Sequence, residues 1–211
     1  MLDLYMDLKK DKMFNDYILA GGTALALQLG HRTSTDLDLF TTHEQSNREI
    51  LNKINEKYGQ YFINSLQPSF LELFIKNIKV DVGQYKAKVL EIPKTIDGIT
   101  LFGKKDLVAM KLNATLTRGK GRDFIDIAYL LNTYSLKEMF EIYKKKYETK
   151  NIDSLKISLK RCKAIPKDEW LIDIKMLKND VDILKIPYLI DKELNKLEKG
   201  FNKYFFKKLI I

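Results

Sequence analysis

The chain has 211 residues, of which 45% are hydrophobic, including 11 Phe and 11 Tyr; this is enough to build a core and excludes a disordered protein. One cysteine, Cys162, excludes an internal disulfide framework and cannot make a zinc site, and two histidines, His31 and His43, argue against a histidine-rich metal site. No apolar run approaches the roughly 20 residues that cross a membrane, and the acidic, amphipathic N-terminus does not resemble a signal peptide, so we expect a cytoplasmic protein without a membrane partner.

The formal net charge of +9 is unevenly spread. Residues 1–102 hold 12 Lys and Arg against 13 Asp and Glu, whereas residues 103–211 hold 25 against 15. A basic second half suggests a polyanion as its partner. The alternative is a set of solvated, lysine-rich helix faces, and charge alone leaves both open.

A small-residue turn stands near the start of the chain. Residues 3–14 predict a first helix, and an apolar run at 17–20 predicts a strand that leads into Gly21 and Gly22. A helix-like run follows at 23–29. Glycines that open a helix expose backbone N–H groups to an anion, and the Thr23 hydroxyl could bind the same anion.

Two acids follow this turn in a predicted strand at 35–40. Strand alternation places Asp36 and Asp38 on one face and two leucines on the other. Like charges at this spacing repel unless a cation lies between them, and carboxylate oxygens suit Mg²⁺. A phosphate-binding turn beside an acid pair predicts a site for a metal-bound nucleoside triphosphate.

The next elements predict the rest of a sheet. An amphipathic helix is expected at 47–58, with Ser46 or Asn47 as its cap. Strands are expected at 60–66 and 70–75, and residues 76–79 form a hairpin connection into a strand at 80–85. A last short strand is predicted at 99–102.

Asp81 is a further candidate acid within the strand at 80–85. Val80 and Val82 face one way and Asp81 the other. If this strand lies beside the one at 35–40, Asp81 becomes a third carboxylate near the acid pair. The alternative is an edge-strand aspartate that faces water.

From residue 104 the pattern is almost entirely helical, which predicts two domains, 1–102 and 103–211. Lysines are interleaved with aromatic residues in the last segment and could contact RNA, although helical spacing of its apolar residues favours a core role. The predicted helices or amphipathic segments lie at 106–117, 123–131, 135–147, 152–162, 167–178 and 187–209, and the apolar positions of the last are Leu189, Leu194, Leu197, Phe201 and Phe205.

Four charged residues around a basic loop are candidates for a second part of the site. Lys111 and Arg118 are seven residues apart and can project from one stripe of a helix. Asp123 and Asp126 share a face of the next helix, although an acid at a helix start is usually a cap. The loop at 118–122 is not a Walker loop, because no Gly-Lys-Ser/Thr follows a strand.

These motifs together resemble those of the AbiEii-type nucleotidyltransferases, the toxins of bacterial abortive-infection and toxin–antitoxin systems. The resemblance rests on Gly21-Gly-Thr-Ala-Leu-Ala-Leu-Gln-Leu-Gly-His-Arg with Asp36-Leu-Asp-Leu-Phe40, and on Lys111-Leu-Asn-Ala, Arg118 and Asp123-Phe-Ile-Asp126. It implies an α+β protein: a polymerase-β-like nucleotidyltransferase core, with a mixed sheet and flanking helices, followed by a C-terminal helical bundle.

The resemblance also implies roles for the candidate residues. The glycine turn would hold triphosphate oxygens, the acid pair and a third acid would bind Mg²⁺ or Mn²⁺, and the second domain would supply phosphate contacts and one more essential acid. These residues are, in that order, Gly21, Gly22 and Thr23; Asp36, Asp38 and Asp81; Lys111 and Arg118; and Asp123 or Asp126.

The activity that this resemblance implies is transfer of a nucleoside monophosphate from an NTP to an acceptor hydroxyl, with the 3′ end of tRNA as the expected acceptor. An antitoxin encoded nearby is then expected as a partner. Two alternatives stay open: nucleotidylation of a small molecule or a protein, and a catalytically silent regulator that binds NTP or RNA.

Overall fold

The computed structural model describes the backbone of residues 1–208 and the side chains of residues 1–198. The chain divides into two compact units, Met1–Leu107 and Val108–Ile211. The boundary lies inside helix α4 (Lys104–Thr117), five residues after the predicted one. The Asp106 carboxylate explains this, because it accepts hydrogen bonds from the backbone N–H groups of Leu90 (2.9 Å) and Glu91 (3.0 Å) and so ties the first turn of α4 to the first unit.

The first unit is built on a mixed sheet of seven strands in the order β3-β4-β5-β2-β1-β7-β6. Two neighbouring pairs are parallel, β2 with β5 and β1 with β7, and the others are antiparallel. The strands are β1 (Ile18–Leu19), β2 (Leu37–Thr41), β3 (Phe62–Gln67), β4 (Phe70–Ile75), β5 (Ile78–Gln84), β6 (Lys94–Ile96) and β7 (Ile99–Leu101).

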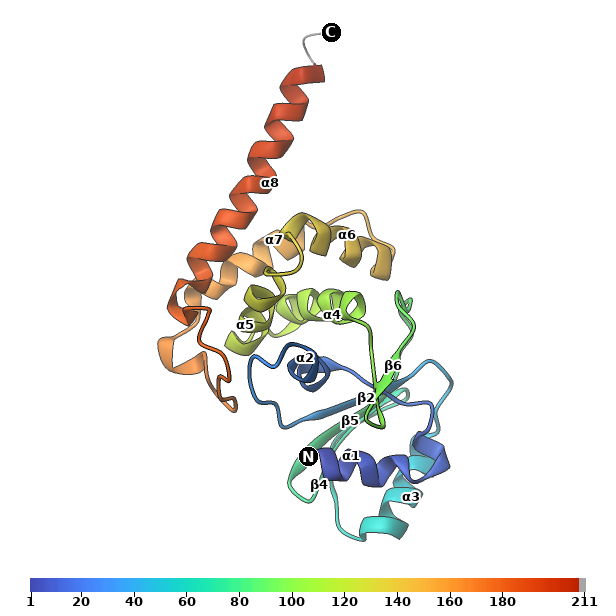
Figure 1. Cartoon of the computed structure of the whole chain (residues 1–211). Helices are drawn as coiled ribbons and strands as arrows, with labels where there is room; N and C mark the ends of the chain where they lie inside the picture. Colours follow the sequence, from blue (N-terminus) through green and yellow to red (C-terminus); the bar gives the residue numbers. More distant parts are fainter. Residues whose placement is uncertain (209–211) are drawn as a thin grey trace. The chain divides into compact units, whose positions relative to one another are not determined.

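Helices lie on both faces of this sheet (Figure 1). Helices α1 (Leu2–Lys9) and α3 (Asn47–Tyr58) cover one face and are joined by a hydrogen bond from the Tyr58 hydroxyl to Asp7 (2.8 Å). Helix α2 (Gly21–Leu29) covers the other. The α3 cap is confirmed, since the Ser46 hydroxyl accepts a hydrogen bond from the N–H of Glu49.

Strand alternation in β5 and β2 separates buried apolar side chains on one face of the sheet from Asp38 and Asp81 on the other, which is called the polar face below. Val80 and Val82 are fully buried, as are Leu37 and Leu39, so these side chains form the core beneath α1 and α3. Asp81 points to the opposite face, as the alternation predicted. The predicted neighbourhood is also confirmed, because β2 pairs with β5 along its whole length.

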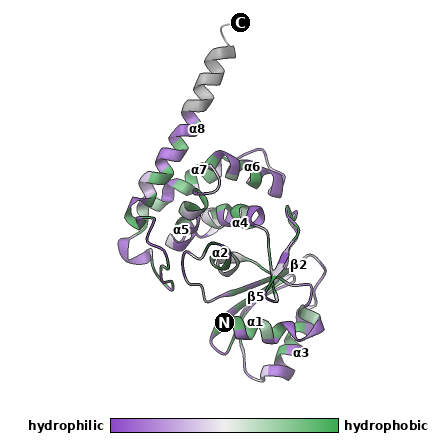
Figure 2. Cartoon of the chain, in the orientation of Figure 1, coloured by the Kyte–Doolittle hydropathy of each residue, from purple (hydrophilic) through white to green (hydrophobic). Residues whose placement is uncertain are grey.

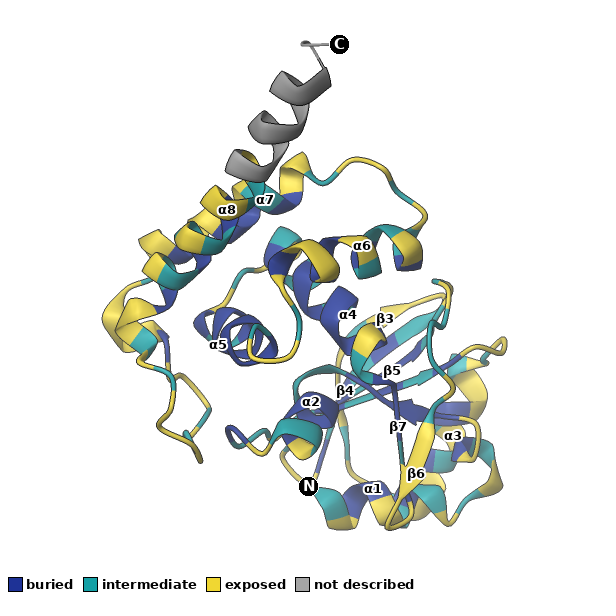
Figure 3. Cartoon of the chain, turned by 45° about the horizontal axis from the view of Figure 1, so that its top comes forward, coloured by how far each residue is buried: buried dark blue, intermediate teal, exposed yellow. Residues whose placement is uncertain are grey.

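The second unit is helical, as predicted. Its helices pack through apolar faces and through a buried hydrogen bond between the Thr115 and Ser158 hydroxyls (2.8 Å). Figure 3 shows that α5 is almost entirely buried, and Figure 2 shows the mixed hydropathy of the amphipathic helix α6. The elements are the rest of α4, α5 (Gly121–Leu130), α6 (Leu136–Tyr147), α7 (Asp153–Lys160), η2 (Arg161–Ala164), η3 (Lys167–Glu169), η4 (Ile183–Lys185) and α8 (Ile186–Lys208).

Three sequence expectations differ from the structure. The predicted helix at 3–14 ends at Lys9, and a separate 3₁₀ turn, η1 (Lys12–Phe14), follows with Asp11 as its cap. The segment at 167–178 is helical only in η3, because Trp170 turns into the core and the chain then runs irregularly. The exposed strand β6 carries no apolar alternation and was not predicted.

Three of the five predicted core positions of α8 lie among the residues whose side chains are described. Leu194 is buried, and Leu189 and Leu197 are half-buried, whereas Phe201 and Phe205 lie outside the residues whose side chains are described. Among the described residues no helix is both long and apolar enough to cross a membrane.

Candidate active site

The N-terminus of α2 meets the Asp38 side chain. Gly21 begins the helix with a φ of +63°, and a Cβ built at Gly21 would lie 1.7 Å from Asp38 Oδ2. Only glycine fits both the backbone conformation and this close approach. Since Ala20, the residue before the helix, has no polar side chain to cap it, the first N–H groups of α2 stay available to an anion.

The second and third residues of the helix contact the segment that leads to the acid pair. A Cβ at Gly22 would lie 2.7 Å from Arg32 Nη2. The Thr23 hydroxyl hydrogen-bonds to the Ser34 hydroxyl (2.9 Å) and to the backbone carbonyl of Asp36. The structure therefore places the Thr23 hydroxyl, which was expected to bind an anion, on the chain itself, where it positions Asp36.

Arg32 is a buried cation that the sequence reasoning did not single out. Its side chain is buried beside Gly22, and its Nη1 donates to the Thr33 carbonyl (2.8 Å). A guanidinium beside the start of a helix suits a phosphate group. The sequence held one signal for Arg32, because it is the one Lys or Arg between the glycine turn and the acid pair.

A row of three acids crosses the polar face of the sheet. Parallel pairing of β2 with β5 sets Asp38 opposite Asp81, and antiparallel pairing of β5 with β4 sets Asp81 opposite Glu72. Asp36 lies just before β2. The first unit thus brings together the turn, the predicted acid pair and Asp81, and adds Glu72, which the sequence did not reveal because its position depends on strand register.

Lys79 binds two of these acids. Its Nζ lies 2.8 Å from both carboxylate oxygens of Asp81 and 2.9 Å from Glu72 Oε2. Burial raises the pKa of Asp81 to about 6; the hydrogen bond from Lys79 opposes this rise, while the neighbouring charges of Asp38 and Glu72 add to it. The raised pKa of Asp81 is therefore due first to burial, and the like charges of Asp38 and Glu72 on the same face contribute less.

The second unit holds the remaining candidates in a cluster of their own. Lys111 Nζ lies 3.2 Å from Asp123 Oδ1 and 2.7 Å from Asp126 Oδ2. Only 4% of the Lys111 side chain is exposed, and neither carboxylate is exposed at all. The shared helix face predicted for the two aspartates is confirmed, and both bind the same ammonium group.

Arg118 completes this cluster. Its Nε donates to Asp123 Oδ2 and its Nη2 to Asp123 Oδ1, and both distances are 3.0 Å. The Arg118 side chain is 45% exposed. Asp123 also caps α5, accepting from the N–H of Lys120 (3.3 Å). Burial would raise the pKa of Asp123, but the charges of Lys111 and Arg118 outweigh it and lower that pKa. Asp123 is therefore an ionised cap held by two cations.

The sequence matches the family model described as "Nucleotidyl transferase AbiEii toxin, Type IV TA system" over residues 3–102 and 76–197. Together these ranges cover most of the chain and both clusters. The chain belongs to this family. It is therefore a nucleotidyltransferase of a toxin–antitoxin type, and the family implies a nucleotide substrate and an antitoxin partner.

Two further likenesses accompany this AbiEii assignment. An uncharacterized protein of Aquifex aeolicus strain VF5 is 35% identical over 145 residues, which make up 66% of this chain and 69% of that protein. The crystal structure of JHP933 from Helicobacter pylori covers 98% of this chain and 96% of its own, with a TM-score of 0.54 and 20% sequence identity. At this identity the second likeness supports the nucleotidyltransferase-like fold alone.

The carboxylates of this AbiEii protein fit a divalent cation only in part. Among the described residues no three His, Cys, Asp or Glu side chains converge as a ready metal site. Mg²⁺ in nucleotide enzymes is commonly held by one or two carboxylates together with phosphate oxygens. Asp38, with Asp36 before it and Asp81 beside it, satisfies that smaller requirement.

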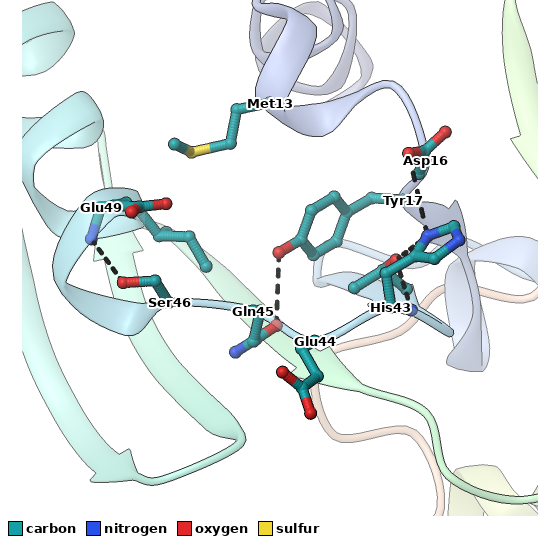
Figure 4. Close-up of a pocket in the computed structure, with 10 residues that line it drawn as sticks. Met13, Asp16, Tyr17, His43, Glu44, Gln45, Ser46 and Glu49 are labelled. Atoms are coloured by element: carbon teal, nitrogen blue, oxygen red, sulfur yellow. Dashed lines mark hydrogen bonds and ion pairs between the residues drawn. The ribbon is translucent and has the colours of Figure 1, made fainter.

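One pocket of the first unit lies away from these residues (Figure 4). It has a volume of about 130 Å³ and lies at the opposite end of β2 from Asp38, near Thr41. His43 Nδ1 is 3.8 Å from Asp16 Oδ2, and the Tyr17 hydroxyl donates to Gln45 (3.3 Å). None of the predicted site residues lines this pocket, so the candidate active site is defined by the acid row and the start of α2.

Proposed function

We propose that this AbiEii protein transfers a nucleoside monophosphate from an NTP to the 3′-terminal hydroxyl of an RNA, with tRNA as the preferred acceptor. The observation that carries the proposal is the pairing of Asp38 with Asp81 across β2 and β5, beside a helix N-terminus that approaches Asp38 at Gly21. This arrangement combines a carboxylate site for a cation with N–H groups for phosphate oxygens.

Mg²⁺, or Mn²⁺ in its place, would be held by Asp36 and Asp38, with Asp81 beside them, and when bound it supplies positive charge to the phosphates and to the attacking oxygen. The N–H groups at the start of α2 and the guanidinium of Arg32 would orient the triphosphate. The acceptor oxygen forms a bond to the α-phosphorus as the bond to the bridging oxygen breaks, so pyrophosphate leaves and the hydroxyl proton is released. Asp81 would orient the acceptor hydroxyl.

The candidates of the second unit have proposed roles of a different kind. Lys111 is committed to Asp123 and Asp126, so its predicted phosphate contact would need one of these ion pairs to open. Arg118 is the half-exposed cation of the cluster. We assign the phosphate contact first to Arg118 and give Lys111 the role of organising the two acids.

An RNA acceptor is supported by charge. The second unit, residues 108–211, holds 23 Lys and Arg against 14 Asp and Glu, whereas residues 1–107 hold 14 of each. A polyanion is attracted to such a unit more strongly than a small neutral acceptor. We further propose that the enzyme acts in the cytoplasm, as an abortive-infection toxin whose antitoxin is encoded nearby.

Labelling tests the reaction directly. The purified protein is incubated with Mg²⁺, one α-labelled NTP at a time, and tRNA, total protein or a small-molecule extract. We expect label only in the RNA fraction, and sequencing of RNA 3′ ends then names the donor and the acceptor together. Label confined to protein or small molecules would replace the RNA acceptor, and nucleotide binding without any transfer would favour a silent regulator.

A pair of variants ties the reaction to the acid row. Asp38→Asn removes one charge with little change of shape and should reduce transfer by at least about 100-fold. Asp16→Asn removes an exposed acid of the same unit and should keep wild-type activity. Equal activity of Asp38→Asn and wild type would refute the proposed site.

A further inference from the structure

Lys79 is held between acids of two neighbouring strands. Its ammonium is within 2.8 Å of both Asp81 oxygens and 2.9 Å from Glu72 Oε2. Glu72 is itself held on its other oxygen by the Asn64 side-chain amide. Lys79 and Asp81 are two residues apart in β5, so their side chains share the polar face, and the ammonium lies between carboxylates rather than in open solvent.

The negative charges of this row of three acids are compensated at one end only. Asp38, Asp81 and Glu72 lie side by side across β2, β5 and β4, and Lys79 neutralises the end of the row formed by Asp81 and Glu72. Asp38 lies at the other end, next to the start of α2. The first unit therefore supplies its own counter-ion for Asp81. None of the lysines in residues 1–107 forms an ion pair with Asp38.

We propose that Lys79 takes the place of a second divalent cation at Asp81, so that the site holds one divalent cation, at Asp36 and Asp38, rather than two. This inference rests on the proposed function. A cation bound to Asp81 at about 2.1 Å from its oxygens would stand close to the ammonium of Lys79, and the two positive charges would repel each other. Glu72 holds Lys79 in that position, and Lys79 in turn fixes the Asp81 carboxylate. Lys79 is thus a positioning residue.

Counting bound Mn²⁺ tests this role without reference to activity. Free Mn²⁺ is measured by electron paramagnetic resonance during titration of the full chain, in the presence of a non-hydrolysable NTP analogue. Wild type should bind one Mn²⁺ tightly. Lys79→Met should bind a second, with at least about tenfold higher affinity than any second site of wild type, and Lys79→Arg should keep the wild-type count. Equal counts and affinities in wild type and Lys79→Met would overturn the proposal.

Two controls keep the result clear. Lys86→Met removes an exposed lysine just beyond the same strand and should leave the Mn²⁺ count unchanged, which excludes a general effect of net charge. Should Lys79→Met fail to fold, Mn²⁺-soaked crystals of wild type decide the matter by anomalous scattering. One Mn²⁺ peak, with Lys79 still on Asp81, supports the proposal, and two peaks with Lys79 turned away refute it.

The transfer assay separates this inference from the proposed function. An active wild-type enzyme whose Mn²⁺ count does not change on removal of Lys79 refutes the role of Lys79 alone. If wild type is inactive in transfer and Lys79→Met still binds a second Mn²⁺, the role of Lys79 is supported and the proposed reaction is refuted.

Discussion

Gly21 joins backbone conformation to the chemistry of the site. Its φ of +63° disfavours any other residue, and its missing side chain leaves the space that Asp38 Oδ2 occupies. Gly30, at the other end of α2, has nearly the same φ, +61°, but nothing lies within 4 Å of a Cβ built there. Substituting each glycine in turn therefore distinguishes the strain of a left-handed backbone, which both share, from displacement of Asp38, which only Gly21 would cause.

We expect Gly21→Ala to abolish transfer and Gly30→Ala to keep it. Both substitutions should lower the free energy of unfolding by about 1–2 kcal/mol through the left-handed backbone, but only the first displaces Asp38. Urea denaturation and the labelling assay, run on both variants, measure the two effects. If Gly21→Ala and Gly30→Ala retained the same activity, the close approach to Asp38 would have no functional meaning.

The raised pKa of Asp81 predicts a pH dependence of stability. Since burial raises the pKa of Asp81 from 3.8 to about 6 in the folded state, the folded protein binds more protons than the unfolded chain between these values. Stability from this group is therefore lost as the pH rises through that interval. Asp81→Asn should remove the loss, so its advantage in unfolding free energy over wild type should grow from pH 4 to pH 6. A constant difference over that range would contradict the assignment.

At the scale of elements, α4 and α5 are joined by a buried ion network. Lys111 belongs to α4 and Asp123 and Asp126 to α5, and all three are almost completely buried. Removing one partner of such a network leaves an uncompensated buried charge. The network therefore has a structural role whether or not it also contacts substrate.

Two variants separate these roles. Asp123→Ala should destabilise the protein by about 3–5 kcal/mol, because it leaves the Lys111 charge with one partner fewer and removes the cap of α5. Arg118→Ala removes a half-exposed partner and should cost about 1 kcal/mol or less, yet reduce transfer if Arg118 contacts phosphate. Chemical denaturation and the labelling assay give the two readings, and an Arg118→Ala variant with full activity would remove Arg118 from the site.

Elements with a strong pattern were predictable, and weakly patterned ones were not. Helix α3 and strand β4 match their predicted ranges, and the capping box of Ser135 and Glu138 opens α6 as expected. The helix predicted at 167–178 was wrong. An amphipathic pattern fits any segment that buries one side, and Trp170 is buried here although the helical turn spans only Lys167–Glu169.

For the whole molecule, the distribution of charge leads to a prediction about binding. The first unit is neutral overall and the second carries all of the excess positive charge. If RNA binds through phosphate contacts, its affinity should fall by at least about tenfold between 50 and 200 mM salt, because counter-ions are released on binding. Filter binding of tRNA at both salt concentrations measures this, and an affinity independent of salt would exclude a polyanion held by charge.

The sequence by itself determined the chemistry of the first unit: a glycine turn, an alternating acid pair and a third acid on the polar side of its strand are local patterns with local causes. Tertiary structure decided which of these residues meet. Strand order and register set Asp81 beside Asp38 and brought in Glu72 and Lys79, and burial paired Lys111 with two aspartates. Register and burial depend on the packing of the whole unit, so no local pattern could specify the charge balance of the site.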